Sequence, residues 1–291
     1  MTISVIIPAY QGEKYLNLFS LPSLVAQTYQ DWEAIVVDDA SSDNTQELIE
    51  SWQAKDRRIK YLRHDYNRGL AASLNTGLKA SQGKIIAFLE QDDIWLNNKL
   101  ARQADILSKK KLTDCRSFLF NETTLKLINI GGGNFSTLAG QRETINKLFP
   151  LPENKKYLGI EDGLLAGRLA LLTDNQILLA EDINHTNDIM VLVSRHQSSL
   201  SGHGHSLTYI QRYQAALDFF DADKSPGLSR LKHSWRLRRQ LNILLSFFPA
   251  PVQKIIRGLN IISKIRALWR LQKIKNKPTY LAAKKIISNL R

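Results

Sequence analysis

The 291-residue sequence predicts an α/β fold built on a mostly parallel β-sheet flanked by helices. Short β-branched or apolar runs alternate with helical patterns through the first hundred residues, which is typical of right-handed βαβ units. Hydrophobic residues make up 43% of the chain and charged residues 23%, a balance that favours a globular domain over a disordered or repetitive chain. No apolar run approaches the ~20 residues that span a bilayer.

Four strands are expected in this region, over residues 3–8, 32–37, 59–62 and 84–89. The first strand is almost wholly apolar, as expected for a strand covered on both faces. The helix after it begins at Tyr15 and is expected to kink or restart near Pro22, because proline interrupts a helix interior. A second helix is predicted behind a capping box formed by Asp43 and Gln46, and a third over residues 70–80.

Acidic residues directly follow two of these strands. Asp38 and Asp39 come after the second strand, and Glu90, Asp92 and Asp93 come after the fourth. The carboxyl ends of parallel strands are where α/β sheets bind ligands, so an acidic cluster is predicted at the ligand site. Capping of the next helix is the alternative role for such acids. Three carboxylates within four residues repel one another, and Mg²⁺ or Mn²⁺ with a diphosphate would neutralise them.

Several other function classes lack their signatures. No Gly-Lys-Ser/Thr occurs and no Gly-x-Gly-x-x-Gly follows the first strand, which argues against P-loop NTPases, kinases and dinucleotide-binding enzymes. The lone cysteine, Cys115, excludes an internal disulfide and a cysteine-rich zinc site, and it fits a reducing compartment. The N-terminus has no positively charged leader, so a cytoplasmic protein is expected.

Three segments of the first 110 residues together resemble a known family. They read ISVIIPAYQGEKYL, AQTYQDWEAIVVDDASSDNT and NRGLAASLNTGLKASQGKIIAFLEQDDIWLNNKL. This combination is similar to the nucleotide-sugar-binding half of the family 2 glycosyltransferases, which have the GT-A fold. A sparser match follows at residues 160–163 with Arg168 and Leu169, and again at residues 194–201. Residues 111–155 match only the general layout of the family.

The resemblance implies a donor-binding pocket at the end of the first strand. The side chains it assigns to this pocket are Pro8, Ala9, Tyr10, Glu13 and Asp39. The first three would line the nucleoside pocket, Glu13 would flank it, and Asp39 would contact the base or the ribose. Arg68 lies in the corresponding loop, where it would either offset the charge of the diphosphate or remain a solvated surface arginine.

The resemblance also implies a site for Mn²⁺ or Mg²⁺. Residues 90–92 occupy the position of the family's Asp-x-Asp motif, with Asp92 as the principal metal ligand. Glu90 is one methylene longer than the usual first acid of that motif. Asp93 would lie beside the sugar or the metal. His196 is assigned to the metal or the diphosphate, and a hydrogen-bonded structural histidine is the alternative.

Asp162 is the catalytic base that the resemblance implies. Gly159 and Gly163 bracket it and leave local room for an acceptor. One metal and one base suffice for a direct displacement that inverts the anomeric centre, without the carboxylate pair of glycosidases. The alternative is an N-terminal cap, because leucines continue at helical spacing from residue 164 to residue 172. Both roles are compatible, since a base at a helix start is rigidly aimed.

Positive charge is concentrated at the C-terminus. Residues 224–291 contain 17 Lys or Arg and no acid, whereas residues 1–223 contain 23 basic and 27 acidic residues. We therefore divide the chain into a catalytic domain, residues 1–222, and a basic amphipathic helical region, residues 223–291. Within the first, residues 1–110 form the nucleotide-sugar half and residues 111–222 the acceptor half.

The basic region predicts contact with an anionic membrane surface, because apolar stripes and aromatic residues accompany its cations. Binding of nucleic acid is an alternative that this apolar content argues against. A helical subdomain packed on the catalytic domain is a second alternative.

The sequence thus predicts a metal-dependent, inverting glycosyltransferase. It would move a sugar from a nucleotide-sugar donor to a saccharide acceptor, lipid-linked, in the assembly of a surface polysaccharide at the inner face of the membrane. Two other functions remain open. A sugar nucleotidyltransferase also uses a nucleotide-binding sheet with acidic metal ligands, and a catalytically degenerate glycosyltransferase would act as a membrane-associated scaffold.

Overall fold

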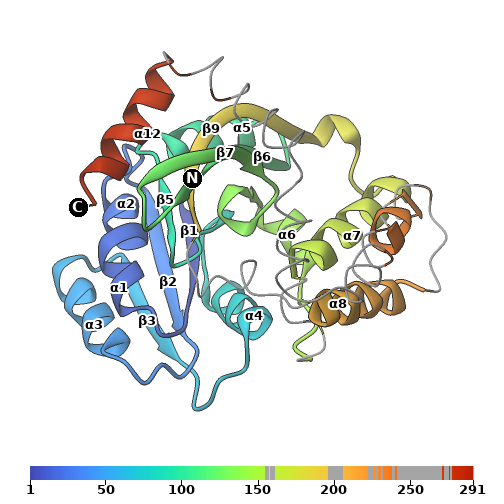
Figure 1. Ribbon diagram of the computed structural model, residues 1–291, viewed down its shortest axis with the longest axis horizontal. Coiled ribbons are helices and arrows are strands. Elements are labelled where there is room, and N and C mark those ends of the chain that lie inside the picture. Colours follow the sequence, from blue (N-terminus) through green and yellow to red (C-terminus); the bar gives the residue numbers. More distant parts are fainter. Residues whose placement is uncertain are drawn as a thin grey trace.

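The computed structural model describes residues 1–154, 157, 161–195, 206–221, 226, 229–230, 232–237, 240, 271, 275 and 277–290. Within these residues, strands form one sheet of order β3-β2-β1-β4-β8-β6-β9-β5, and β7 pairs with β6 (Figure 1). The strands are β1 Ile3–Ala9, β2 Trp32–Asp38, β3 Ile59–Arg63, β4 Ile85–Phe88, β5 Asp93–Trp95, β6 Leu112–Asn121, β7 Lys126–Gly132, β8 Ala139–Gln141 and β9 Ile183–Arg195. Helices flank this sheet, which confirms the predicted α/β fold.

The four parallel strands coincide with the four predicted ones to within one or two residues. Strand β1 pairs in parallel with β2 and β4, and β2 pairs in parallel with β3. Alternate side chains of β1 enter different hydrophobic clusters: Val5 and Ile7 join one, and Ile6 joins another with Phe88. All four side chains are fully buried, which explains why the strand shows no polar alternation.

Helices cover both faces of the parallel strands. The main ones in the first 110 residues are η1 Leu16–Ser20, α2 Leu21–Val25, α3 Thr45–Lys55, α4 Leu70–Ala80 and α5 Lys99–Leu107, with the short α1 Glu13–Tyr15 preceding them. The predicted change near Pro22 is confirmed, because η1 is a π-helix and α2 begins at Leu21 with proline in its first turn. The predicted helix 70–80 is also confirmed.

The predicted capping box at Asp43 is wrong in detail. Helix α3 begins at Thr45, with Asn44 in the N-cap position. Asp43 lies one residue earlier, where its Oδ1 accepts hydrogen bonds from the backbone N–H and the hydroxyl of Thr45. Gln46 turns away and donates to Glu50 along the helix. Asp43 therefore binds the first residue of the helix, Thr45, and does not form the reciprocal hydrogen bonds of a capping box with Gln46.

The chain after residue 111 continues the sheet with mixed pairing. Strand β8 pairs antiparallel with both β4 and β6, β9 runs parallel to β6, and β5 pairs antiparallel with β9 as the last strand of the order. The remaining described helices are η2 Phe135–Thr137, α6 Arg142–Leu148, α7 Glu161–Asp174, η4 Ala180–Asp182, α8 Ser206–Phe219 and α12 Pro278–Ser288. None of the helices in the described part of the chain is both long and apolar enough to cross a membrane.

The described parts of the basic region pack on the catalytic domain. Ala283 and Ile287 of α12 are buried in one cluster with Phe118 and Ile94 of the sheet. Figure 1 shows α12 beside α2, although more than 250 residues separate them. Trp235 is likewise buried against residues of α7 and α8. The packed-subdomain alternative therefore holds for these residues, whereas residues 241–270 of the predicted amphipathic region lie outside the described residues.

Candidate active site

The predicted ligand-binding edge lies where the chain reverses direction across the sheet. From β1 the chain proceeds to β2 and β3 on one side and then crosses to β4 on the other. The point between β1 and β4, where the strand order reverses, is the usual ligand position in such sheets. Gln91, after β4, accepts a hydrogen bond from the Tyr10 backbone N–H at 2.9 Å and donates one to the Tyr10 carbonyl at 3.1 Å.

This Gln91 clamp fixes the predicted nucleoside loop against the acidic motif. A Cβ atom at Gly12 would lie 2.5 Å from the Gln91 amide oxygen, so any other residue there would displace the Gln91 side chain from this position. Ala9 is buried, whereas the Tyr10 ring is 48% exposed and free to pack against a flat ligand. Pro8 is partly buried at the end of β1, and Glu13 accepts a hydrogen bond from the Asn44 amide at 3.2 Å.

The loops after β1 and β2 are fastened to each other. The Gln11 N–H donates to the Ser41 hydroxyl at 3.0 Å, and the Gly12 N–H donates to the Thr45 hydroxyl at 2.8 Å. Gln11 and Ala40 adopt left-handed backbone conformations, with φ of 50° and 61°, which cost energy for residues with a side chain. Such strained residues on both loops are typical of positions where function constrains the backbone.

Asp39 is buried and largely engaged by the protein. Its Oδ1 accepts from the Arg68 N–H at 2.8 Å and lies 2.7 Å from His64 Nδ1, and its Oδ2 accepts from the Gly69 N–H at 2.7 Å. A carboxylate offers about four acceptor positions. These contacts use three of them and leave one on Oδ2 for a ribose hydroxyl or a base N–H. The carboxylate therefore fixes the 68–69 loop and still fits the predicted contact.

Arg68 lies at this edge in an ion pair. Its guanidinium donates to Glu153 at 2.7 Å, and both side chains are a little over one-third exposed. Glu153 also accepts from the Asn75 amide at 3.0 Å, and Asn75 binds both the N–H and the carbonyl of Leu151 at 2.8 Å. Arg68 is thus tethered to the 151–153 loop. To offset the charge of a diphosphate, as predicted, its guanidinium would have to bind the diphosphate together with Glu153 or in place of it.

The acids after β4 converge around one amide. Asn134 Nδ2 donates to Glu90 at 3.2 Å and to Asp93 at 3.1 Å, and the Glu90 N–H donates to the Ser136 hydroxyl at 2.9 Å. Desolvation, followed by the charges of Asp93, Asp162 and Asp92, raises the pKa of Glu90 well above its usual value. The neighbouring carboxylates and burial therefore both oppose ionisation of Glu90.

Asp162 belongs to the same electrostatic environment. It lies in the first turn of α7, about seventy residues after the acids that follow β4. This is also the position expected for its alternative role as an acid at a helix start. Its charge nevertheless contributes to the raised pKa of Glu90, so the fold brings it within electrostatic reach of that carboxyl. Arg168, from the same motif, instead donates to the Leu148 and Pro150 carbonyls and holds the end of α6.

The end of β9 approaches the cluster from the opposite side. The Ser194 hydroxyl lies 3.4 Å from Asp92 Oδ2, in the segment that the sequence comparison with the family singled out. His196, two residues later, lies outside the described residues, so its assignment stays a prediction.

A divalent cation fits the chemistry of these donors. Among the described residues, no three His, Cys, Asp or Glu side chains are grouped to enclose a metal ion by themselves. Mg²⁺ in nucleotide enzymes usually takes one or two carboxylates and completes its shell with phosphate oxygens and water. The carboxylates of Asp92, Asp93 and Asp162, which raise the pKa of Glu90, and the buried Oδ1 of Asn134, which has no hydrogen-bond partner among the described residues, favour a cation or an ordered water that arrives with the substrate.

Two side chains that contact the acids after β4 were not predicted from the sequence. Asn134 and Ser136 lie in the stretch 111–155, where the family resemblance is weak, and nothing in their spacing relates them to the acids after β4. They approach the acids because β8 pairs antiparallel with β4, which brings the preceding segment η2 beside the end of β4. The GGGN run before η2 was a weak indication of a special backbone there, since Gly133 has a φ of 80°.

Comparison with known proteins agrees with this architecture. Residues 4–144 match the family model described as Glycosyl transferase family 2. An uncharacterized glycosyltransferase of Haemophilus influenzae is 34% identical over 191 residues, which cover 60% of this chain and 76% of that protein. The UDP-Glc:alpha-D-GlcNAc-diphosphoundecaprenol beta-1,3-glucosyltransferase WfgD of Escherichia coli is 39% identical over 146 residues, half of this chain. The chain matches only 54% of WfgD's length.

Solved structures share the fold over nearly the whole chain. A crystal structure of S. aureus TarS 1–349 in complex with UDP-GlcNAc superposes with a TM-score of 0.63 and 18% identity, covering 99% of this chain and 92% of that chain. The sheet order, the acids at its carboxyl edge and these comparisons agree, and the protein belongs to glycosyltransferase family 2 and has the GT-A type fold.

Proposed function

We propose that this glycosyltransferase transfers a sugar from a nucleotide-sugar donor to a lipid-linked saccharide acceptor, with inversion of the anomeric centre. The convergence of Glu90, Asp92 and Asp93 with Asp162 at the sheet's switch point carries the proposal, because transfer needs a diphosphate site beside a base. The name of WfgD describes transfer to a diphosphoundecaprenol-linked sugar, which supports a lipid-linked acceptor. This chemistry places the enzyme in the assembly of a surface polysaccharide.

On the donor side, the nucleoside would lie over the loops after β1 and β2. The exposed Tyr10 ring offers a face for the base. The remaining acceptor position on Asp39 suits a ribose hydroxyl or a base N–H. Pro8, Ala9 and Glu13 would shape the rest of this pocket from β1 and α1. The Gln91 clamp then sets the distance from the nucleoside to the acids that follow β4.

On the diphosphate side, Asp92 would be the principal ligand of Mn²⁺ or Mg²⁺, with Glu90 and Asp93 beside it and His196 as a further candidate. Such a cation, when bound, stabilises the negative charge of the departing nucleoside diphosphate. Glu90 would become ionised on loading, because the cation offsets the neighbouring carboxylates that raise its pKa. Asn134 would keep the Glu90 and Asp93 carboxylates apart through its two hydrogen bonds.

On the acceptor side, Asp162 would accept the proton of the attacking hydroxyl. The acceptor oxygen bonds to the anomeric carbon as the bond to the nucleoside diphosphate breaks, so a single displacement inverts that carbon. The position of Asp162 in the first turn of α7 aims the carboxylate from a rigid helix. Tyr157 and Leu164 anchor that helix to a cluster that also holds Phe220 and Trp235.

Replacement of Asp162 by Asn tests the base. The amide keeps the shape of the side chain but cannot take up the proton, so we expect turnover to fall by ~10²-fold or more with donor affinity near that of the wild type. Turnover is measured as nucleoside diphosphate released from a panel of nucleotide sugars with Mn²⁺, and donor affinity by calorimetry. A collapse of donor affinity in this variant would instead place Asp162 in the donor site.

The products of the wild-type enzyme separate the competing functions. Release of nucleoside diphosphate together with a glycosylated acceptor supports transfer. Release of pyrophosphate from a nucleoside triphosphate and a sugar phosphate supports a nucleotidyltransferase. Release of neither product from any donor in the panel supports the degenerate scaffold. The anomeric configuration of the product, read by NMR, tests inversion directly.

We further propose that the basic region 223–291 holds the enzyme on the inner face of the membrane. Residues 224–291 of this region carry 17 cations and no acid, which suits an anionic lipid surface. Because α12 packs in the core, truncation would damage the fold, so the test replaces Lys254, Arg257 and Lys264 by Gln in the full chain. We expect weaker co-sedimentation with anionic vesicles than the wild type shows, and binding that falls with salt. Unchanged vesicle binding would refute this location.

A further inference from the structure

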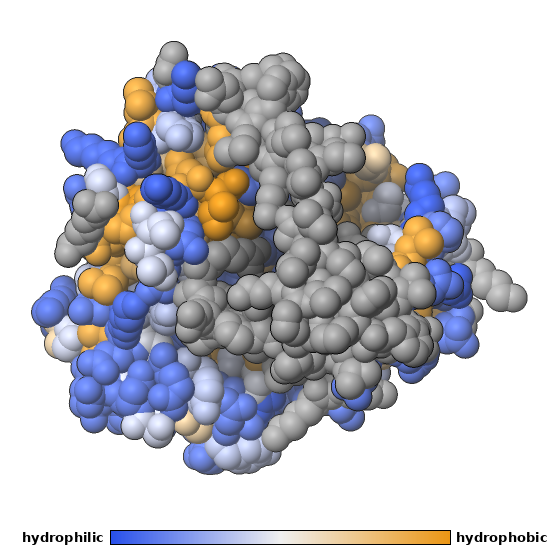
Figure 2. All heavy atoms as spheres, in the orientation of Figure 1, coloured by the Kyte–Doolittle hydropathy of each residue, from blue (hydrophilic) through white to orange (hydrophobic). Residues whose placement is uncertain are grey.

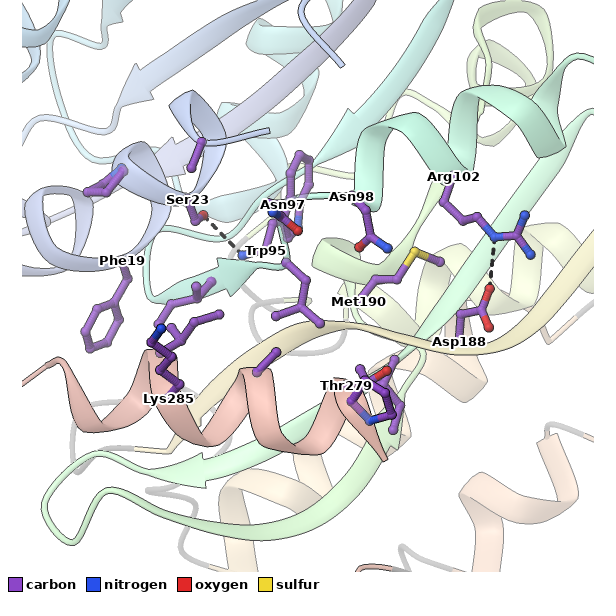
Figure 3. A pocket seen from close by; sticks show the side chains of 18 of the residues that line it. Phe19, Ser23, Trp95, Asn97, Asn98, Arg102, Asp188, Met190, Thr279 and Lys285 are labelled. Atoms are coloured by element: carbon purple, nitrogen blue, oxygen red, sulfur yellow. Dashed lines mark hydrogen bonds and ion pairs between the residues drawn. The ribbon is translucent and has the colours of Figure 1, made fainter. Parts of the chain in front are cut away.

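A pocket of about 800 Å³ lies between the sheet and the C-terminal helix α12. In Figure 3, α12 crosses the pocket opposite Phe19 and Ser23, which belong to η1 and α2, with Trp95 of β5 and Met190 of β9 between them. The volume falls in the range of sites that bind small molecules. Among the described residues, none of those assigned to sugar transfer above lines this pocket.

The pocket is mainly apolar and opens to an apolar surface. Its aliphatic and aromatic lining includes Leu18, Phe19, Ile94, Met190, Ile286 and Leu290. Leu18 is 48% exposed, and Leu281, next to the pocket-lining Ala282, is 54% exposed. Figure 2 shows hydrophobic surface at the upper left of the molecule, where Figure 1 has α12 and α2. Exposed apolar area beside a pocket marks a surface that meets an apolar partner.

The charges around the pocket favour a ligand with a negative end. Arg102, at one end in Figure 3, is paired with Asp188 at 3.2 Å. At the other end Lys285 of α12 lines the pocket, and the sequence of α12 contains two lysines and no acid. A hydrocarbon chain that carries a phosphate therefore matches both the lining and the charge, whereas an uncharged apolar ligand matches only the lining.

The pocket is connected to the acidic cluster through β5. Asp93 of this strand accepts the hydrogen bond from Asn134, and the next residue, Ile94, lines the pocket. Trp95, two residues after Asp93, lines the pocket as well, and its indole N–H donates to the carbonyl of Ser136, whose hydroxyl binds the Glu90 N–H. Strand β5 therefore contributes both to the acidic cluster and to the wall of the pocket, so the two sites adjoin along this strand.

We propose that this pocket binds the isoprenoid chain of the acceptor, next to its phosphate end. The inference rests on the proposed function, because a lipid-linked acceptor must place its sugar at the acids while its chain lies on an apolar surface. It adds to that function a chain-binding site that would select isoprenoid-linked acceptors over soluble saccharides. Helix α12, with Lys285, would then be part of the acceptor site and not only a support for the sheet.

Binding of farnesyl diphosphate to the full chain, measured by calorimetry below its micelle concentration, tests the site without requiring turnover. Ala282 is exposed and lines the pocket, so Ala282→Trp fills the pocket from the surface. We expect this variant to bind farnesyl diphosphate about tenfold or more weakly, as loss of burial of a few methylene groups predicts. Ser288→Trp, on the same helix but outside the lining, is the matched control and should bind as the wild type does.

Three further measurements decide the outcome. Inorganic diphosphate should bind all variants equally, because it has no chain. Leu18→Ser, at the exposed mouth, should weaken farnesyl diphosphate binding even if Ala282→Trp unfolds. Hexadecyl phosphate should bind more weakly than farnesyl diphosphate, and equal affinity would overturn the isoprenoid assignment. Equal binding of farnesyl diphosphate and inorganic diphosphate by the wild type would overturn the pocket itself, even where the enzyme transfers sugar to a soluble acceptor.

Discussion

Two glutamates at opposite ends of the parallel strands have opposite environments. Glu33, at the start of β2, is 8% exposed, and its carboxylate accepts from Lys60 at 2.7 Å and from the Ser4 hydroxyl and the Gln82 N–H at 2.6 Å each. Burial by itself would raise the pKa of Glu33, but these hydrogen bonds lower it to about 2. Glu90, after β4, has three acids nearby, and desolvation and their charges raise its pKa well above the usual value.

The difference distinguishes a structural carboxylate from a functional one. At the amino edge Glu33 has its partners within the chain, so this carboxylate stabilises the fold. At the carboxyl edge the fold keeps acids together at a cost in stability, which is typical of sites that are completed by a ligand. The two edges therefore predict opposite responses when a carboxylate is removed.

The largest expected effect is on transfer, at the carboxyl edge. Replacement of Asp92 by Ala removes the principal ligand of the proposed cation, and with it several kcal/mol of stabilisation of the leaving diphosphate. We expect transfer to fall by roughly 10³-fold, with the fold retained because carboxylate repulsion is relieved. The measurement is nucleoside diphosphate release at saturating Mn²⁺.

Asp31→Ala, at the exposed amino edge, is the control for this prediction. Asp31 accepts from the Thr2 hydroxyl at 2.8 Å and pairs with the N-terminus, far along the chain from the acids of β4. Its removal should leave transfer unchanged. Wild-type, Mn²⁺-dependent transfer by the Asp92 variant would show that the cation site is elsewhere.

The second effect is on the free energy of unfolding at neutral pH. It should fall when a carboxylate is removed at the amino edge and rise when one is removed at the carboxyl edge. The folded pKa of Glu33, about 2, lies below its ordinary value of 4.5. Glu33 therefore contributes stability that is present above pH ~4.5 and is lost as the pH falls toward 2. Glu33→Gln should cost about 3 kcal/mol at neutral pH and almost nothing near pH 2.

Glu90→Gln is the counterpart at the other edge. Because the folded pKa of Glu90 is raised, the folded state binds more protons above pH ~4.5, and the contribution of this carboxyl to stability falls as the pH rises through that window. Without metal, Glu90→Gln should therefore unfold at a higher denaturant concentration than the wild type at neutral pH. Urea titrations at several pH values measure both variants. Destabilisation of both to the same extent would show that the two edges do not differ.

The sequence predicted the donor half closely because its signals are local. Strand boundaries, the helix 70–80 and the restart near Pro22 all follow from residue types within a few positions of each other. The acids after β2 and β4 were placed at one edge because parallel strands share a direction. Asp162 was placed by family resemblance alone, and the structure brings it within electrostatic reach of Glu90.

What the sequence could not predict depends on contacts between distant segments. The pairing of β4 with β8 brings Asn134 and Ser136 to the acids, and no periodicity of residues 111–155 indicates that pairing. The basic composition of residues 223–291 indicated a surface element, whereas Ala283, Ile287 and Trp235 are buried. A helix with apolar residues on one face suits a protein core as well as a lipid surface, so composition alone does not distinguish them.

The smallest expected effect tests Asn134, which holds two of the acids at the carboxyl edge. Asn134→Ala removes the amide that donates to both Glu90 and Asp93. Because that hydrogen bond lowers the pKa of Glu90, its loss should raise the pKa further and make ionisation on metal loading less favourable. We expect the affinity for Mn²⁺, measured by electron paramagnetic resonance with the nucleoside diphosphate present, to fall about tenfold, as for other residues that orient metal ligands. Asn175→Ala, at an exposed turn after α7, is the control and should bind Mn²⁺ as the wild type does. Lowering the pH should widen the gap between the Asn134 variant and the wild type, since protons then compete for a carboxyl that has lost its donor. A Mn²⁺ affinity equal to that of the wild type across this pH range would show that Asn134 supports only the backbone of η2.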